Sequence, residues 1–132
     1  MDIIKVSNIL GWYASLVSQT VRYECWSDEW CRKEIKRYND SMLEELRPLI
    51  DWYHLSINEA SVLGFHKWDG DLYLIPLYLL PILPIGIEVT CISGEKIIYD
   101  GKNIDDDQRF GCIAYGINIT DKVDSEIKNE TL

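Results

Sequence analysis

Four aspartates in the second half of the chain are of a type that could bind a metal cation. Asp105, Asp106 and Asp107 are consecutive, and Asp100 lies shortly before them. Carboxylate oxygens suit calcium or magnesium. However, no Asp-x-Asp-x-Asp-Gly run occurs and no Glu closes a twelve-residue register, so the pattern is not an EF-hand loop. We therefore expect no metal here, and interpret the segment as a solvated loop whose aspartates help to turn the chain.

Two histidines and two cysteines are the residue types of a zinc site. His54 and His66 are 12 residues apart, and Cys91 and Cys112 are 21 apart. Zinc modules use much shorter ligand spacings. The interpretation is two ordinary histidines and two thiols of the core, with no cofactor implied.

Motifs for nucleophilic or phosphate chemistry are missing from the sequence. It contains no Gly-x-Ser-x-Gly, no Gly-x-x-x-x-Gly-Lys and no Gly-x-Gly-x-x-Gly. We therefore predict that the chain is not an enzyme. One alternative stays open, a small enzyme or ligand-binding domain with a site near His66, Arg109 and Asp105–Asp107.

The first half of the chain has the apolar spacing of helices. Apolar residues recur every three or four positions over residues 1–22, which predicts one helix. Ser27 and Asp28 offer a cap for a second helix, which Asn39-Asp40-Ser41 would interrupt, and Ser41 with Glu44 has the spacing of a capping box. Ser56 with Glu59 predicts another cap, before a short turn that precedes Val62.

The second half has the pattern of strands and turns. Asp69-Gly70 between two apolar runs, 62–68 and 71–75, predicts a β-hairpin. The charge-free run 72–87 carries three prolines and is predicted to be buried extended chain. Further strands are predicted at 87–91, 96–99 and 109–119, the last with Gly111 and Gly116 as bulges or points of close approach.

These elements predict one α+β domain over residues 1–120, with N-terminal helices packed on one face of a C-terminal antiparallel β-sheet (a meander). Residues 121–132 are charge-rich and are predicted to be a flexible tail. No secretory signal is recognised at the N-terminus, so we expect a cytoplasmic protein with reduced thiols. A disulfide between Cys91 and Cys112 across paired strands is left open.

The 132-residue chain has a formal net charge of −9 and a pI near 4.6. Such an acidic balance argues against direct binding of nucleic acid or of anionic membrane surfaces. The excess is concentrated in residues 69–107, which hold eight acidic residues and two lysines. The sheet therefore has an acidic rim, suited to a basic protein partner or simply to solubility.

Exposed aromatic residues beside carboxylates are the usual composition of a protein-binding patch, because aromatics anchor a contact and charge steers it. The aromatic candidate is Trp68, which adjoins the predicted hairpin turn. The predicted partner-binding residues are Trp68, Asp69, Asp71, Glu88, Glu95, Asp100, Asp105, Asp106 and Asp107.

A small, acidic, aromatic-rich domain without catalytic motifs resembles the immunity proteins that neutralise bacterial polymorphic toxins, including those of contact-dependent growth inhibition. The resemblance implies tight binding to a cognate toxin domain, often a basic nuclease, by covering its active site. We expect the chain itself to be a monomer or a small homo-oligomer. A variant of this hypothesis is a phage or plasmid anti-defence protein that acts as an acidic nucleic-acid mimic.

Overall fold

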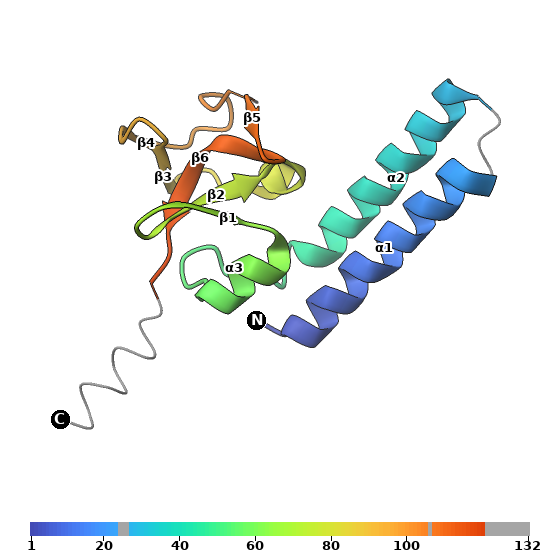
Figure 1. Ribbon diagram of the computed structural model, residues 1–132, viewed down its shortest axis with the longest axis horizontal. Coiled ribbons are helices and arrows are strands. Elements are labelled where there is room, and N and C mark those ends of the chain that lie inside the picture. The colour runs from blue at the N-terminus through green and yellow to red at the C-terminus, as the bar shows by residue number, and fades with distance from the viewer. Residues whose placement is uncertain (24–26, 106, 121–132) are drawn as a thin grey trace. The chain divides into compact units, whose positions relative to one another are not determined.

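The computed structural model describes residues 1–23, 27–105 and 107–120 (Figure 1). The chain divides into two compact units, Met1–Asp51 and Trp52–Leu132. The first is helical, and the second holds an antiparallel sheet with meander-like strand order. The predicted α+β class is thus confirmed. The predicted flexible tail, 121–132, lies outside the described residues.

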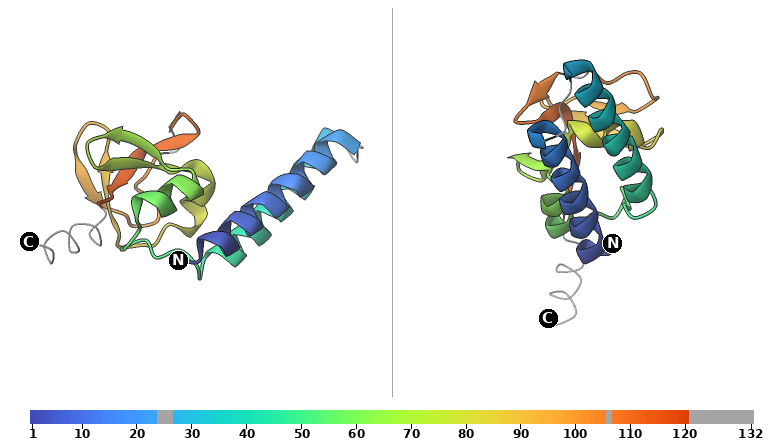
Figure 2. Two further views of the ribbon diagram at one scale, coloured as in Figure 1. Left: turned by 60° about the horizontal axis from the view of Figure 1, so that its bottom comes forward. Right: turned by 90° about the vertical axis from the view of Figure 1, so that its right-hand side faces the viewer.

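The first unit is a pair of packed helices, α1 (Ile3–Tyr23) and α2 (Asp28–Leu46) (Figures 1 and 2). The carboxylate of Asp2 begins α1 by accepting a hydrogen bond from the backbone N–H of Lys5, at 3.0 Å. The hydroxyl of Ser27 caps α2 by accepting from the N–H of Trp30, at 3.1 Å. The Ser27 cap is as predicted, and the apolar spacing of residues 1–22 located the first helix.

The interruption predicted at Asn39-Asp40-Ser41 is wrong, because α2 runs through it to Leu46. Asp40 bonds to Lys36 one turn earlier, at 2.8 Å, and this pair favours the helix at the point where a break was expected. Met42, Leu43 and Leu46 then continue the buried stripe. The Ser41–Glu44 capping box does not form, since both residues lie inside the helix. Pro48 follows two residues beyond the end of α2.

The second unit begins with a short helix, α3 (Ile57–Leu63). The predicted capping box is confirmed. The Ser56 hydroxyl accepts from the Glu59 N–H at 3.1 Å, and the Glu59 carboxylate accepts from the Ser56 N–H at 3.0 Å. Gly64 ends the helix in the left-handed conformation, with φ of 96°. Val62 is therefore helical, and the first strand begins at His66 instead.

The sheet is built from β1 (His66–Asp69), β2 (Leu72–Pro76), β3 (Glu88–Cys91), β4 (Lys96–Ile98), β5 (Gln108–Arg109) and β6 (Cys112–Asn118). Its order is β1-β2-β6-β3-β4, with β5 paired to β6. All pairs are antiparallel. The last strand thus lies between the two hairpins β1–β2 and β3–β4, as Figure 1 shows.

Two predicted strands are corrected. The proline-containing run 72–87 is not extended throughout, because β2 passes into a 3-10 helix, η1 (Leu77–Ile82). The long strand predicted at 109–119 is broken by a tight turn at Phe110-Gly111, where both residues have positive φ.

The core of the second unit centres on fully buried Leu74, Ile75, Leu79, Val89 and Ile113. No described helix is long and apolar enough to cross a membrane.

Candidate partner-binding surface

Trp68 occupies a β-bulge in the edge strand β1. His66 pairs with Leu74 and Lys67 with Tyr73, but the next pair is Asp69 with Leu72, which leaves Trp68 as the extra residue. A bulge disrupts the ladder and turns a side chain to a new direction. The Trp68 side chain is 37% exposed. It is therefore a partly open aromatic beside two aspartates, as the sequence predicted.

The loop of this hairpin is one residue later than predicted. Because Asp69 pairs with Leu72, the two loop residues are Gly70 and Asp71. Gly70 has a φ of 56° and Asp71 does not have a positive φ, which is the sign pattern of a type II′ turn. Asp69 and Asp71 are both exposed at the tip of the hairpin.

The predicted acidic residues lie at two different ends of the sheet. Leu72 pairs with Asn118 and Thr90 with Gly116, so the start of β2, the end of β6 and the start of β3 share one end. This "Asp71 end" carries four exposed carboxylates: Asp69, Asp71, Glu88 and Asp100. The "Tyr115 end" carries three more: Glu95, Asp105 and Asp107. Asp106 lies outside the described residues.

Asp100 stabilises the loop in which it lies by hydrogen bonds to the backbone. Its Oδ1 accepts from the backbone N–H groups of Lys102 and Asn103, at 2.8 and 2.9 Å. Asn103 returns a bond to the Asp100 N–H at 3.0 Å and donates to the Ile98 carbonyl at 2.8 Å. This aspartate therefore helps to turn the chain, as the sequence predicted for the aspartates of this segment. Glu88, also at the Asp71 end, lies 4.0 Å from the ammonium of Lys96.

Tyr115 is the centre of the Tyr115 end. It pairs with Cys91, whose N–H donates to the Glu95 carbonyl at 2.7 Å. Burial raises the pKa of the Tyr115 phenol, and nearby Asp105, Cys91 and Glu95 raise it further, whereas a backbone hydrogen bond at Asp105 opposes the rise. Asp105 and Glu95 come from separate loops, yet both lie close enough to raise the pKa of the Tyr115 phenol. The Asp107 carbonyl accepts from the Ala114 N–H at 3.1 Å, which fixes the same loop to β6.

Phe110 is a further exposed aromatic residue that was not among the predicted site residues. Its ring stacks on the imidazole of His66, with centroids 4.6 Å apart and ring planes at 21°. It is also 74% exposed and has a φ of 57°. A hairpin was not predicted there because Gly111 was interpreted as an irregularity within one strand. The structure thus places His66 beside the turn that follows Arg109, two of the residues of the alternative ligand site.

The cysteines are in different states. Cys91 and Cys112 are free, so the disulfide left open between them does not form. Cys91 pairs with Tyr115, whereas Cys112 pairs with Pro76 and Arg109, three residues away along β6. Cys31 is disulfide-bonded, which corrects the expectation of reduced thiols at that position. Among the described residues, no group of three or more His, Cys, Asp or Glu side chains is arranged to hold a metal.

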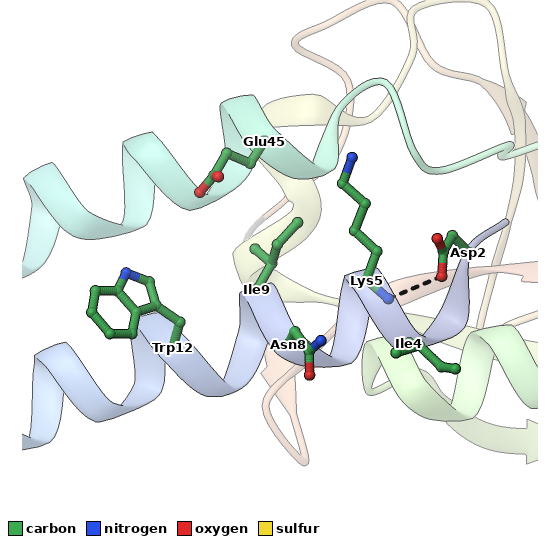
Figure 3. Close-up of a pocket in the computed structure, with 7 residues that line it drawn as sticks. All are labelled: Asp2, Ile4, Lys5, Asn8, Ile9, Trp12 and Glu45. Atoms are coloured by element: carbon green, nitrogen blue, oxygen red, sulfur yellow. Dashed lines mark hydrogen bonds between the residues drawn. The ribbon is translucent and has the colours of Figure 1, made fainter.

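A pocket of about 500 Å³ lies on the helical unit. It is lined by Asp2, Ile4, Lys5, Asn8, Ile9, Trp12 and Glu45 (Figure 3). Figure 3 shows the Glu45 carboxylate of α2 pointing toward α1. A hydrogen bond to Glu45 raises the pKa of the Tyr13 phenol, and burial and the Glu45 charge add to the rise. Glu45 of α2 thus interacts with Tyr13 of α1. None of the predicted site residues lines the pocket.

Comparison of the chain with protein-family models, with curated proteins and with solved structures finds no match. The fold and the surfaces described above are therefore the basis for any functional conclusion.

Proposed function

We propose that this chain is an inhibitor of the immunity-protein type, which binds a basic toxin domain through the acidic sheet of its second unit. The observation that carries the proposal is the exposure of the predicted carboxylates. Every one of them that the structure describes is exposed, at the Asp71 end or the Tyr115 end. Removing these charges from contact with water costs least when a partner supplies the opposite charge.

These carboxylates would first raise the rate at which the two proteins associate, before any close contact forms between them. A surface of one charge sign attracts an oppositely charged partner and can raise the association rate roughly 10- to 1000-fold at low salt. Rigid carriers also favour the affinity of the complex, because the charges need no ordering on binding. Asp69 and Asp71 lie on a tight hairpin, and Asp107 is fixed to β6 by its backbone.

The described charges of the helical unit do not form a surface of one sign. Its exposed charges alternate in sign along α2, where Lys33 lies 3.3 Å from Glu29 and Arg47 lies 3.1 Å from Glu44. Such pairs leave little net field at a distance. This favours the sheet unit as the side that meets a basic partner.

The nucleic-acid mimic is supported less well. A mimic needs a continuous row of carboxylates in place of the phosphates, whereas Asn118 and Ala114, which mark the two ends, are four residues apart along β6. That separation is about 13 Å at the usual rise of a strand. Asp100 is also engaged with its own backbone.

The test uses the polypeptide encoded immediately upstream of this chain as the probe. We expect it to inhibit growth when expressed alone, to be harmless when co-expressed with this chain, and to bind it in solution. The charge-neutral variants Asp69→Asn/Asp71→Asn and Asp105→Asn/Asp107→Asn are then compared by stopped flow at low and high salt. At least one pair slows association severalfold at low salt, and the difference disappears at high salt.

The matched control is Glu29→Gln/Asp40→Asn, which removes the same charge from the exposed face of α2. It should leave the association rate within twofold of the unmodified protein. The proposal is overturned if the upstream polypeptide neither binds nor is neutralised. It is also overturned if all three double variants associate at the same rate.

A further inference from the structure

We infer that Phe110 is the aromatic anchor of this interface, inserting into an apolar pocket beside the basic surface of the toxin domain. The inference rests on the proposed function and names the residue through which that function would hold its partner. Trp68 was the predicted anchor, yet its side chain is 37% exposed, half the value for Phe110 at 74%.

The geometry of this turn does not favour a phenylalanine. Arg109 pairs with Cys112, so Phe110 and Gly111 form a two-residue hairpin loop with φ values of 57° and 74°. Such loops favour asparagine, aspartate or glycine in the first position, because a bulky side chain is strained at positive φ. Among the described residues, Phe110 is the one non-glycine residue with positive φ. A strained residue in an exposed position suggests a role other than stability.

The exposed ring is held in place. Stacking on His66, at a centroid distance of 4.6 Å, fixes the orientation of the phenyl ring while most of its surface stays in water. An anchor that is already ordered loses little conformational freedom on binding, which strengthens the complex. His66 belongs to β1 and is joined to β2 through Leu74, so the platform is part of the sheet.

The neighbouring charges determine the kind of partner. Phe110 lies on the β5–β6 hairpin, which follows directly on the loop that carries Asp105 and Asp107. Glu95 and Asp105 both raise the pKa of Tyr115, which lies three residues along β6 from Cys112, the partner of Arg109. With exposed Arg109 included, these four charged side chains carry a net charge of about −2, because three are acidic and one is basic. The partner that fits is a basic protein surface with an apolar recess for the ring.

The experiment compares Phe110→Asn with Ile85→Asn, using the same upstream polypeptide as the probe. Ile85 is the matched control because it is 72% exposed and belongs to the loop before β3. We expect Phe110→Asn to weaken affinity at least 30-fold, mostly through faster dissociation, and Ile85→Asn to bind within twofold of the unmodified protein. His66→Ala should give a smaller loss, because the ring remains and only its platform is removed.

A second measurement, made without the partner, separates an anchor from a structural residue. Since Asn accepts positive φ, Phe110→Asn should leave the melting temperature unchanged or raise it. A fall of more than about 5 °C would show that Phe110 stabilises the fold and overturn the inference. Unchanged dissociation of Phe110→Asn from a probe that does bind the unmodified chain overturns the inference alone. A probe that fails to bind the unmodified chain overturns the proposed function with it.

Discussion

The backbone of Gly116 in β6 packs directly against the carbonyl group of Tyr73 in β2. A Cβ atom at this position would overlap the Tyr73 carbonyl oxygen and would lie 2.8 Å from the carbonyl carbon and 3.0 Å from Cδ1 of Leu72. Backbone atoms of a paired strand cannot move aside as the end of a flexible side chain can. Glycine is therefore required here by close approach, as one of the two interpretations of this position predicted.

Replacing Gly116 with alanine should destabilise the sheet. The inserted methyl group forces β2 and β6 apart, and overpacking of this kind costs about 1–3 kcal/mol. We expect the free energy of unfolding, measured by urea denaturation, to fall by an amount in this range. Gly11→Ala is the control, since a Cβ at Gly11 meets nothing within 4 Å and alanine favours the helix. Equal stability of the two variants would contradict the packing argument.

The capping box of α3 should make stability fall in acid. Burial acts to raise the pKa of Glu59, but hydrogen bonds from the Ser56 N–H and hydroxyl lower it, and the net pKa lies below the ordinary value of 4.5. The ionised carboxylate therefore stabilises the fold above that pH, and the contribution is lost as pH falls through the folded-state pKa. Glu59→Gln should flatten this part of the profile in denaturation curves between about pH 6 and 3.

The Ser56 half of the same box is tested separately. Ser56→Ala removes the hydroxyl that accepts from the Glu59 N–H and should cost about 1 kcal/mol of stability. Asn or Asp at position 56 should restore most of this loss, because either side chain can cap a helix.

For the Glu59 prediction, a pH profile of stability that is as steep in Glu59→Gln as in the unmodified protein would show that other carboxylates cause the acid dependence.

Tyr78 should make stability fall in alkali. Its hydroxyl donates to the Leu63 carbonyl at 2.5 Å, joining η1 to the end of α3, and burial raises its pKa well above the ordinary value of 10.0. A raised folded-state pKa means that the contribution is complete below about pH 10 and is lost as pH rises beyond it. Tyr78→Phe should cost about 1–2 kcal/mol at neutral pH and weaken the alkaline dependence. Phenolate absorbance should show that Tyr78 ionises only as the protein unfolds.

The two free thiols should react at different rates. Cys112 is 2% exposed, and burial raises its pKa despite an opposing backbone hydrogen bond from His66, whereas Cys91 is half-buried. Because the thiolate is the reactive form, iodoacetamide at pH 8 should modify Cys91 at least tenfold faster, as followed by peptide mass spectrometry. Both should react alike in denaturant. Similar rates in the folded protein would mean that the Cys112 site opens readily.

Local signals predicted the helices and the first hairpin, and neighbouring residues explain why. Ser27, Ser56 and Asp2 cap helices through bonds that span three residues, so a short window of sequence contains the whole interaction. The break expected at Asn39-Asp40-Ser41 failed because burial of Met42 and Leu43 outweighs the turn preference of three polar residues. The place of β6 between β2 and β3 depends on pairing across distant segments, which local patterns do not report.

The candidate surface was predicted in composition but not in layout. Trp68, Asp69 and Asp71 were placed together correctly because they share one hairpin. Glu95 and Asp105 could not be assigned to one end, since their approach to Tyr115 depends on the order of the strands. Phe110 was missed because a phenylalanine at positive φ contradicts the turn preferences on which the prediction relied.

The central place of β6 also determines when the second unit can fold during synthesis. The hairpins β1–β2 and β3–β4 are joined through this strand, which leaves the ribosome after the other described strands, and an isolated hairpin is marginally stable in water. Until Asn118 has emerged, both hairpins expose strand edges that another chain could pair with. The helices of the first unit contact each other over a short sequence distance and can form earlier. A nascent chain stalled before β6 should therefore be held by chaperones or aggregate, with its helical unit already formed.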